Sequence, residues 1–513
     1  MIVRQFCTAR TASRALSISS HARPTITMPL RARIAVNAMA QSPRSQSTAA
    51  PAAAAAEPAP ENPEDDVLFD STKGIRTITL NRPNKYNALN SSMAGKILPR
   101  LMEWQKSQIA NIIVIKGAGE KAFCAGGDVA VLAAQNRNGG AGQQASIDYF
   151  ALEYKLDNLI AKYPKPYVAF MDGITMGGGV GLSLHGHFRI ATERTMFSMP
   201  ETTIGFFPDV GASFFLPRLD GYLGTYLALT SERLTGVQAY WAGVATHYIH
   251  SSSLQDLQDR LAELEFNDHD DLQWRLENIN STIEEYVTGL PHNEPFILGG
   301  KTREAIDRCF RYNTIDEIMQ ALRDEGSEWA SKTIKTLRSR SPMALRVTLL
   351  EMRYGAAWTI NTAFMREFHM ARKFMNHNFH PDFVEGVEKQ LAKPVEGVKI
   401  PPSWRPASIE ETTDSKALQY FEIEDGAQRL DLVTVPGEVD FANYPHGWLG
   451  LPSENAVKIM LGKGERKTVA ELEKAVLRQW ENKVGVQEKL KDVFQRKIKE
   501  GPGGIAEWKV EDV

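Results

Sequence analysis

Cysteine is scarce in this chain of 513 residues, which contains only Cys7, Cys124 and Cys309. Three cysteines this far apart do not make a disulfide framework and are typical of a protein from a reducing compartment. Long hydrophobic runs are also lacking, because no apolar stretch approaches the ~20 residues needed to cross a bilayer. Neither charge dominates, since 59 Lys and Arg stand against 62 Asp and Glu. The formal net charge of −3 therefore gives no overall attraction to nucleic acid or to a membrane.

Acidic residues are missing from the first 56 positions, whereas arginine occurs at positions 4, 10, 14, 23, 31, 33 and 44. This Arg-rich, Ser-rich composition without acids is typical of a mitochondrial transit peptide, and a disordered basic tail is the alternative. Thr48–Asp66 then has the composition of a Pro/Ala linker with an acidic end. We therefore expect residues 1–65 to be a presequence and linker, and the protein to be located in the mitochondrial matrix.

The next part of the chain, residues 66–253, alternates strand and helix patterns. Residues 67–83 predict two strands joined by a turn at Lys73-Gly74, and residues 91–107 predict a helix with its apolar side chains near one face. Further apolar strands each lead into a glycine-rich turn and then a helix. Alternation of this kind predicts an α/β core.

The remainder of the chain divides into two blocks. Amphipathic patterns such as "LQDLQDRLAELEF" and "ALRVTLLEMRYG" predict a helical region over residues 254–408, which ends in a proline-containing break at Pro394–Ser408. Residues 409–513 form a separate C-terminal extension, in which Thr468 and Glu471 fit a capping box before a helix. The extension is mildly basic, which a solvated helix face explains more simply than contact with RNA.

Two glycine-rich turns are candidates for a ligand site: "KAFCAGGDV" at Lys121–Val129 and "GITMGGGVGL" at Gly173–Leu182. Each follows a strand and precedes a helix, so backbone N–H groups at these turns point outward. Two such turns side by side can aim two N–H groups at one oxygen atom, which is an oxyanion hole. Neither turn fits the phosphate-binding loop or the dinucleotide-binding spacing.

Other polar residues near these turns have simpler interpretations. Asp128 is expected to be the N-cap of the following helix. Cys124 is a candidate nucleophile, but no partner base is apparent, so a small buried residue is the preferred interpretation. His185 and His187 are expected to be packed or capping histidines.

The stretch "FSMPETTIGFFPDVGASFFLPRL", Phe197–Leu219, places two acids among phenylalanines, glycines and prolines. Glu201 and Asp209 would be costly to bury without partners. Apolar neighbours are expected to raise the pKa of one or both carboxyl groups, which is a property of catalytic acids and bases.

Four motifs then occur in order: "NRPNKYNALNSSM", "KAFCAGGD", "GITMGGGVGLSLHG" and "MPETTIGFFPDVGASFFLPRL". Together they resemble the crotonase (enoyl-CoA hydratase) superfamily, and specifically its 3-hydroxyisobutyryl-CoA hydrolase branch. The resemblance runs from about Val67 to Pro406 and includes "DFVEGV" at Asp382–Val387. It implies a crotonase-like spiral of ββα units, with a helical region and an extra C-terminal extension.

The resemblance implies an oxyanion hole made by the backbone N–H groups of Ala125 and Gly178, around the carbonyl oxygen of a coenzyme A thioester. It implies no metal or redox cofactor, and the sequence contains no His/Cys/Asp cluster with metal-ligand spacing. Hydratases of the superfamily carry one catalytic Glu just after the GGG turn and a second in a "PE" motif. Here Gly181 occupies the first position, Glu201 occupies the second, and Asp209 is a new acid. This hydrolase pattern argues against simple addition of water to a double bond.

The resemblance gives Glu201 two alternative roles, either as a nucleophile that forms a mixed anhydride or as a general base on water. Asp209 would position the water or the substrate's 3-hydroxyl, or protonate the leaving thiolate. Glu153, in "YFALEYKLDN", matches a family position that lines the acyl pocket, so we expect it to bind substrate. A solvent-facing helical acid is the alternative for Glu153.

The function implied by the resemblance is hydrolysis of 3-hydroxyisobutyryl-CoA in valine catabolism. The alternative is a structural component of the mitochondrial small ribosomal subunit, because fungal-type members of this branch resemble a protein of that subunit. The C-terminal extension, which a compact hydrolase does not need, is then a docking segment. A hydratase or isomerase is the third hypothesis, and Gly181 argues against it. Trimers are common in the superfamily, but the helical region and extension leave the oligomeric state open.

Overall fold

The structure of the protein is a computed structural model that describes residues 63–509, except residues 268, 396, 435, 436, 438, 464 and 465. The predicted presequence and linker, residues 1–65, lie almost entirely outside the described residues, so they remain a prediction. None of the described helices combines the length and the apolar character that a bilayer-spanning helix needs.

The described part contains 12 strands and 19 α-helices. The strands are β1 (Val67–Thr72), β2 (Ile75–Leu80), β3 (Ile112–Gly117), β4 (Ala122–Cys124), β5 (Tyr167–Met171), β6 (Ile174–Met176), β7 (Phe188–Ala191), β8 (Met196–Ser198), β9 (Leu234–Thr235), β10 (His247–Tyr248), β11 (Ile498–Glu500) and β12 (Ala506–Trp508). The helices of the first half are α1 (Ser91–Trp104), α2 (Val129–Arg137), α3 (Gly140–Ala161), α4 (Gly178–Leu184), α5 (Ala212–Phe215), α6 (Leu223–Thr230), α7 (Val237–Trp241), α8 (Leu254–Ala262) and α9 (Leu272–Glu284). The later helices are α10 (Gly300–Phe310), α11 (Ile315–Glu325), α12 (Glu328–Arg338), α13 (Pro342–Gly355), α14 (Ile360–Phe374), α15 (Asp382–Leu391), α16 (Asp414–Leu418), α17 (Glu454–Gly462), α18 (Val469–Gln479) and α19 (Val486–Lys497). The short 3-10 helices are η2 (Pro63–Asp65), η3 (Pro83–Lys85), η4 (Glu201–Ile204), η5 (Leu216–Arg218), η6 (Ser251–Ser253), η7 (Ile409–Glu411), η8 (Gly447–Leu449) and η9 (Pro502–Gly504).

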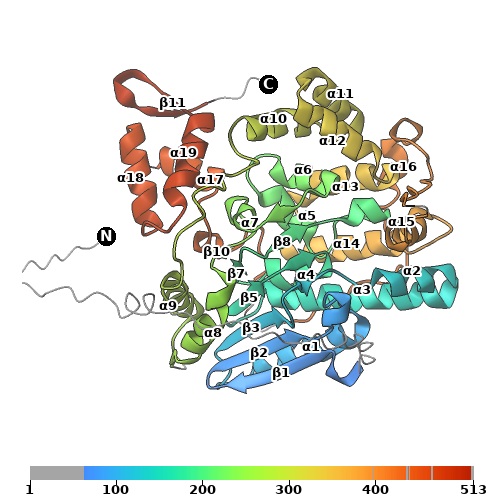
Figure 1. Ribbon diagram of the computed structural model, residues 1–513, viewed down its shortest axis with the longest axis horizontal. Coiled ribbons are helices and arrows are strands. Elements are labelled where there is room, and N and C mark those ends of the chain that lie inside the picture. The colour runs from blue at the N-terminus through green and yellow to red at the C-terminus, as the bar shows by residue number, and fades with distance from the viewer. Residues whose placement is uncertain are drawn as a thin grey trace, which may run out of the picture. The chain divides into compact units, whose positions relative to one another are not determined.

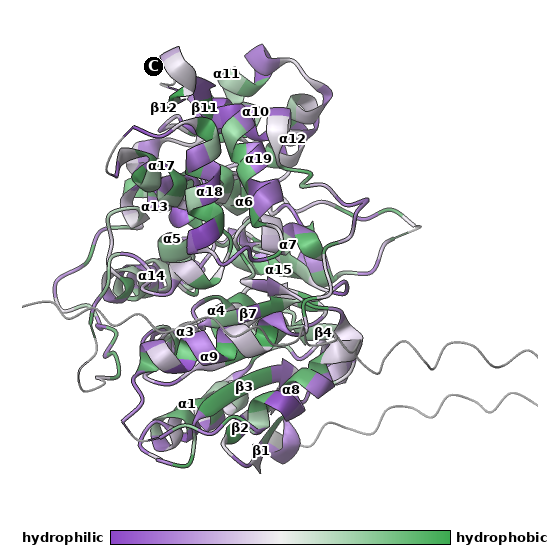
Figure 2. Ribbon diagram, turned by 90° about the vertical axis from the view of Figure 1, so that its left-hand side faces the viewer, coloured by the Kyte–Doolittle hydropathy of each residue, from purple (hydrophilic) through white to green (hydrophobic). Residues whose placement is uncertain are grey.

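The larger sheet has six strands in the order β1-β2-β3-β5-β7-β10. Strands β1 and β2 form the antiparallel hairpin that the sequence predicts, with its turn at Lys73-Gly74, and the remaining pairs are parallel. Helix α1 covers one face and helices α8 and α9 cover the other (Figure 1). Because neighbouring side chains of a strand point to opposite faces, Ile113 and Ile115 of β3 pack with α1, whereas Ile112 and Val114 pack with α8 and α9. The hydrophobic colouring along β3 in Figure 2 reflects this burial on both faces.

A second, four-stranded sheet has the order β4-β6-β8-β9. Each parallel strand of this sheet directly follows a strand of the larger sheet, so that β3 leads to β4, β5 to β6 and β7 to β8. The chain therefore repeats a strand–strand–helix unit as it advances. The carboxyl ends of the parallel strands β4, β6 and β8 lie at one edge, which brings the two glycine-rich turns and Glu201 together.

The helical patterns after residue 254 are confirmed, since α8 to α15 occupy most of Leu254–Leu391. Two of these helices, α14 and α15, cover elements that carry the candidate site. Helix α14 packs on α3, and α15 packs on α2 and on η4, the turn that begins with Glu201. The helical region thus provides part of the apolar shell around the acids.

The C-terminal extension folds as four short α-helices and the β11–β12 hairpin, in which α19 lies beside α10 and α18 packs on α17 and α19 (Figure 1). The predicted capping box of α18 is confirmed. The hydroxyl of Thr468 accepts the N–H of Glu471, and the Glu471 carboxylate accepts the N–H of Thr468 at 2.8 Å. The extension packs on the preceding part of the chain, for example through the Tyr240 hydroxyl, which donates to the Val484 carbonyl at 2.6 Å.

Candidate active site

Glu201 lies where β8 ends and the chain turns through Pro200 into η4. Its side chain is buried, and the described residues provide no hydrogen-bond partner for its Oε2 atom. Burial, then the nearby Asp209 and Glu153 carboxyl groups, raise the pKa of Glu201 well above its usual value. A carboxyl group in this state has the basicity that proton abstraction at neutral pH requires.

Asp209 follows on the loop after η4 and is also buried. The Tyr154 hydroxyl donates a hydrogen bond to its Oδ2 atom at 2.7 Å. Burial raises the pKa of Asp209 to about 7, although the Tyr154 hydrogen bond acts in the opposite direction. The chain then turns sharply, with φ of 56° at Val210 and 83° at Gly211. The left-handed backbone at these two residues directs the chain back into α5 after it has presented Asp209.

The GGGVG turn leaves room for three carboxyl groups. A Cβ atom at Gly177 would lie 3.0 Å from Oε1 of Glu201, and one at Gly178 would lie 2.4 Å from Oε1 of Glu153. A Cβ atom at Gly181 would lie 2.3 Å from Oδ2 of Asp157. The absence of side chains at these glycines therefore lets acids from η4 and α3 approach the backbone where α4 begins.

Glu153 is buried in α3, which excludes the alternative of a solvent-facing acid. The Tyr149 hydroxyl donates to its Oε1 atom at 3.1 Å. Burial and the nearby Asp209 raise the pKa of Glu153 well above its usual value, while the Tyr149 hydrogen bond lowers it. Glu153 thus reaches Gly178 from α3, whereas Glu201 reaches the neighbouring Gly177 from η4.

The two expected oxyanion-hole donors differ in the structure. No described atom accepts the N–H of Gly178, as befits the first residue of a helix. By contrast, the N–H of Ala125 donates to the Tyr86 carbonyl at 3.0 Å, so it is not the unoccupied donor that the sequence led us to expect. The cause is the left-handed backbone at Tyr86, with φ of 53°, in the turn that runs alongside the end of β4.

Three further buried acids, Asp157, Glu351 and Glu367, were not identified from the sequence. Glu367 of α14 accepts the Gly211 N–H at 2.6 Å and the Ser213 N–H at 3.0 Å. Burial raises the pKa of Glu367 to about 8, against the effect of these hydrogen bonds. The signal in the sequence was the spacing within each amphipathic helix, which places these acids toward the buried face. Glu367 holds the loop that follows Asp209.

Asp157 and Glu351 are completely buried, and neither has a hydrogen-bond partner for either carboxylate oxygen in the described part of the chain. Burial raises the pKa of both groups well above the usual values. Together with Glu153, Glu201, Asp209 and Glu367 they make six buried acids, which we call the acid cluster. Within residues 63–509, apart from the seven omitted positions, none of the six forms an ion pair with a lysine, arginine or histidine.

Other predicted residues near the turns are placed as follows. Cys124 is buried, as expected, and burial raises the pKa of its thiol to about 12, so no reactive thiolate forms. Asp128 stands at the N-cap position of α2, but its side chain makes no capping hydrogen bond and instead pairs with Arg82 at 3.0 Å. The capping role is therefore wrong, because the Arg82 guanidinium offers Asp128 a charged partner.

The two histidines after the GGG turn are packed, as the sequence predicts. His187 is buried, and its ring lies 4.2 Å from the ring of His446. His185 lies between the Val210 carbonyl and the Tyr444 hydroxyl, each 2.7 Å from a ring nitrogen. His185 therefore connects the C-terminal extension to the loop that carries Asp209.

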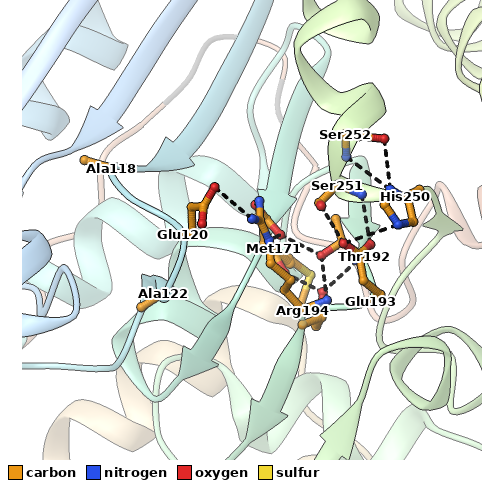
Figure 3. A network of polar contacts seen from close by, with 12 residues as sticks. Ala118, Glu120, Ala122, Met171, Thr192, Glu193, Arg194, His250, Ser251 and Ser252 are labelled. Carbon is orange, nitrogen blue, oxygen red and sulfur yellow. Dashed lines mark hydrogen bonds and ion pairs between the residues drawn. The ribbon is translucent and has the colours of Figure 1, made fainter. Parts of the chain in front are cut away.

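A polar network supports the strands that lead into both glycine-rich turns. Arg194 donates to Asp172, which lies between β5 and β6, and also pairs at 3.4 Å with Glu120, which precedes β4. Figure 3 shows Glu120 on one side of this network and Ser251 with His250 on the other. The network links the segment before β4 to the segment before β6, but the Glu120 side chain is 85% exposed, so this ion pair contributes little to holding the two turns.

The described residues contain no group of three or more His, Cys, Asp or Glu side chains arranged to hold a metal ion. The arrangement that is present consists of buried acids around an unoccupied helix N–H. Such a site can bind a carbonyl oxygen at the N–H, and can use a basic carboxylate to attack it or to activate water.

A spiral of strand–strand–helix units, with acids gathered at the carboxyl ends of its second sheet, defines a crotonase-like protein. The enoyl-CoA hydratase/isomerase family profile matches residues 75–421. Since this match covers more than half of the chain, the chain belongs to the enoyl-CoA hydratase/isomerase family.

Particular relatives fall into two groups. The chain is 48% identical, over the full length of both chains, to the small ribosomal subunit protein mS47 of Neurospora crassa. It is 40% identical to the mitochondrial 3-hydroxyisobutyryl-CoA hydrolase of Homo sapiens, over 70% of this chain and 88% of that one. The corresponding protein of Gallus gallus is 43% identical over 68% of this chain and 86% of its own.

Solved structures show the same fold. A carnitinyl-CoA dehydratase from Mycobacterium thermoresistibile superposes with a TM-score of 0.62 and 31% identity, covering 72% of this chain and 98% of its own. An enoyl-CoA hydratase from Rhodobacter sphaeroides gives a TM-score of 0.60 at 31% identity, with 72% and 100% covered. The predicted crotonase-like α/β fold is confirmed.

Proposed function

We propose that this protein hydrolyses 3-hydroxyisobutyryl-CoA to the free acid and coenzyme A, as a step of valine catabolism. The observation that carries the proposal is the position of Glu201. Its buried carboxyl group lies against Gly177 and, within the described residues, its Oε2 atom has no hydrogen-bond partner and the N–H of the adjacent Gly178 has no acceptor. Relatives that carry this activity in their names support the substrate. Gly181, without a side chain, argues against a hydratase.

In the proposed reaction the thioester carbonyl oxygen binds the Gly178 N–H. The Ala125 N–H would donate to this oxygen while also donating to the Tyr86 carbonyl, and shared donors of this kind are common near helix ends. Attack on the carbonyl carbon places negative charge on the oxygen, and the two donors stabilise it. Collapse of the tetrahedral intermediate breaks the C–S bond, and the thiolate takes up a proton. The reaction requires no metal or redox cofactor.

Glu201 has two alternative roles in this scheme. As a general base it removes a proton from the attacking water, and as a nucleophile it forms a mixed anhydride that water then hydrolyses. Trapping with hydroxylamine, followed by mass spectrometry of the Glu201 peptide, distinguishes them, because only the anhydride gives a modified carboxyl group. Asp209 is the acid that positions water or protonates the leaving thiolate. Glu153 completes the site as a substrate-binding residue.

The test is thioesterase activity of the purified protein beside Glu201→Gln and Asp209→Asn. We expect each substitution to lower kcat by about 10²- to 10⁴-fold, as for the loss of a general acid or base. The matched control is Glu103→Gln, whose side chain is 65% exposed on α1 and should leave activity unchanged. Folded wild-type protein that binds coenzyme A but shows no turnover would overturn the enzymatic function.

A second candidate function is that of a structural component of the mitochondrial small ribosomal subunit. The favouring observation is that the similarity to mS47 spans the whole chain, including residues 409–513, whereas the match to the human hydrolase covers 70% of it. Sedimentation of mitochondrial lysate decides this function: the protein should comigrate with small subunits at low magnesium as well as in intact ribosomes. Migration only as free protein would exclude it. Both functions are compatible in one chain.

Both groups of relatives bear mitochondrial names, which supports a mitochondrial location. Together with the composition of residues 1–65, this leads us to propose the matrix as the compartment. Import into isolated mitochondria, followed by protease treatment of mitoplasts, tests the proposal. Digestion of the imported protein in mitoplasts would place it outside the matrix.

A further inference from the structure

Asp157 is the member of the acid cluster for which the proposed reaction provides no role. It lies on α3, four residues after Glu153, and therefore on the same face of that helix. Its side chain is completely buried, and both of its oxygens lack a hydrogen-bond partner among the described residues. A buried polar group without a partner is costly, because it loses its hydrogen bonds to water and gains none in the protein. The site therefore retains at Asp157 a hydrogen-bonding capacity that the protein itself does not use.

The position of Asp157 relative to the oxyanion hole is set by two facing helices. Glu153 approaches Gly178 of α4, and Asp157 approaches Gly181, three residues further along the same helix. Three residues of α-helix advance by about 4.5 Å. A group that Asp157 can reach therefore lies one helical turn away from the N–H that receives the thioester carbonyl.

The acyl group of the proposed substrate carries a hydroxyl at this separation. The hydroxyl oxygen on C3 is three bonds from the carbonyl carbon, and three bonds of about 1.5 Å extend to just under 4 Å. Asp209 is the competing acceptor for this hydroxyl, but its Oδ2 already accepts the Tyr154 hydroxyl at 2.7 Å. Neither oxygen of Asp157 has a partner among the described residues. The Val210 side chain lies on the same side of Gly181 as Asp157, with its Cβ 2.8 Å from the position of a Cβ at Gly181.

We propose that Asp157 is a specificity-determining residue that accepts a hydrogen bond from the 3-hydroxyl of the acyl group. The inference rests on the proposed hydrolase function and deepens it. A substrate with the hydroxyl satisfies the buried carboxyl group, whereas one without it leaves the carboxyl group unpartnered. Sites built to bind a substrate hydroxyl reject analogues that lack it by large factors.

The experiment compares 3-hydroxyisobutyryl-CoA with isobutyryl-CoA, which differ only in the hydroxyl, in wild type, Asp157→Leu and Asp157→Asn. We expect wild type to prefer the hydroxylated thioester by at least about 100-fold in kcat/KM, and Asp157→Leu to reduce this preference to less than about 10-fold. Asp157→Asn keeps an acceptor oxygen and should retain most of the preference. Equal losses for both thioesters in Asp157→Leu would overturn the proposal.

Binding measurements separate this proposal from the reaction itself. Calorimetry would use analogues of both thioesters in which a methylene group separates the carbonyl from sulfur, so that hydrolysis does not occur. If wild type turns over neither thioester, the proposed function fails, and the analogues alone decide the role of Asp157. Tighter binding of the hydroxylated analogue to wild type, with the difference lost in Asp157→Leu, supports the role, whereas equal binding of the two analogues overturns it.

Asp148→Asn is the matched control, because it changes an exposed acid on the same helix. It should leave both the preference and the affinities unchanged. Asp157→Leu removes a buried, unpartnered polar group, so we expect it to fold, and thermal unfolding verifies this. If Asp157→Leu does not fold, Asp157→Asn still tests the proposal through the ratio of kcat/KM for 3-hydroxyisobutyryl-CoA to kcat/KM for isobutyryl-CoA. A fall of more than about 100-fold in this ratio would contradict the proposal.

Discussion

The candidate site and the junction with the C-terminal extension both bury charged side chains, but they do so in opposite ways. At the junction each buried acid has a cation beside it: Lys489 lies 2.6 Å from Asp220, and Arg496 lies 2.8 Å from Glu454. In the acid cluster no such pair exists among the described residues. Paired charges fasten two parts of a chain, whereas unpaired acids cost stability and are retained where chemistry needs them.

The electrostatic consequence is visible in the pKa values. Burial alone would raise the pKa of Asp220, but Lys489 and Arg303 outweigh it and lower the pKa below its usual value. In the acid cluster burial acts without such cations, so all six pKa values are raised. The extension therefore uses several of its basic side chains within the chain, which reduces the charge that it offers to a partner.

The largest expected effect is the loss of a buried pair at the junction. Arg496→Met removes a side chain only 2% exposed that pairs with Glu454 and Asp492, leaving two acids without this partner. We expect a loss of about 3–5 kcal/mol in the free energy of unfolding. Urea denaturation measures it, with Arg100→Met, a 41% exposed surface arginine, as control at less than about 1 kcal/mol. Equal effects of the two substitutions would show that the junction is not held by its ion pairs.

The next effect is a pH dependence that distinguishes the site from the junction. Because the pKa of Asp209 is raised to about 7, the folded protein binds more protons than the unfolded chain between about pH 4 and pH 7. The contribution of Asp209 to the free energy of unfolding is therefore highest below about pH 4. It falls by at most about 4 kcal/mol as the pH rises to 7. Asp209→Asn keeps an acceptor for Tyr154 and removes this loss.

Denaturation of wild type and Asp209→Asn at several pH values checks the result. The variant should gain stability relative to wild type as the pH rises from 4 to 7, and the gain should then level off. Asp220 has the opposite pH dependence. Because its pKa is lowered in the folded protein, its contribution to stability is lost as the pH falls. A constant difference between wild type and Asp209→Asn over this range would contradict the raised pKa.

A third effect concerns Glu351, which is buried in α13 without partners. Since burial raises its pKa, its ionisation in the unfolded chain opposes folding once the pH exceeds about 4. We expect Glu351→Gln to stabilise the protein by about 1–3 kcal/mol at pH 8 and by little at pH 4. The measurement is the difference between the denaturation midpoints of wild type and Glu351→Gln at each of the two pH values. Destabilisation at pH 8 would show that Glu351 has a partner in solution.

The sequence predicted the parts of the site that depend on local signals. Strand-to-turn transitions identified the glycine turns, and apolar neighbours identified Glu201 and Asp209 as buried acids. Asp157, Glu351 and Glu367 were missed because helical spacing shows which face of a helix is apolar but not that three helices converge on one site. The engagement of Ala125 with Tyr86, and of Asp128 with Arg82, depends on segments about 40 residues apart that only the folded chain brings together.

The smallest effect tests whether local helix signals or buried pairs hold the extension. Thr468→Ala removes the capping box of α18, in which the hydroxyl accepts the Glu471 N–H, and such caps contribute about 1 kcal/mol. Thr468→Ser keeps the hydroxyl and is the matched control. Urea denaturation should show a loss clearly smaller than that for Arg496→Met. If Thr468→Ala lowers the free energy of unfolding as much as Arg496→Met does, the extension depends on its own helices more than on its buried ion pairs. The contrast between the junction and the acid cluster would then depend on the acid cluster alone.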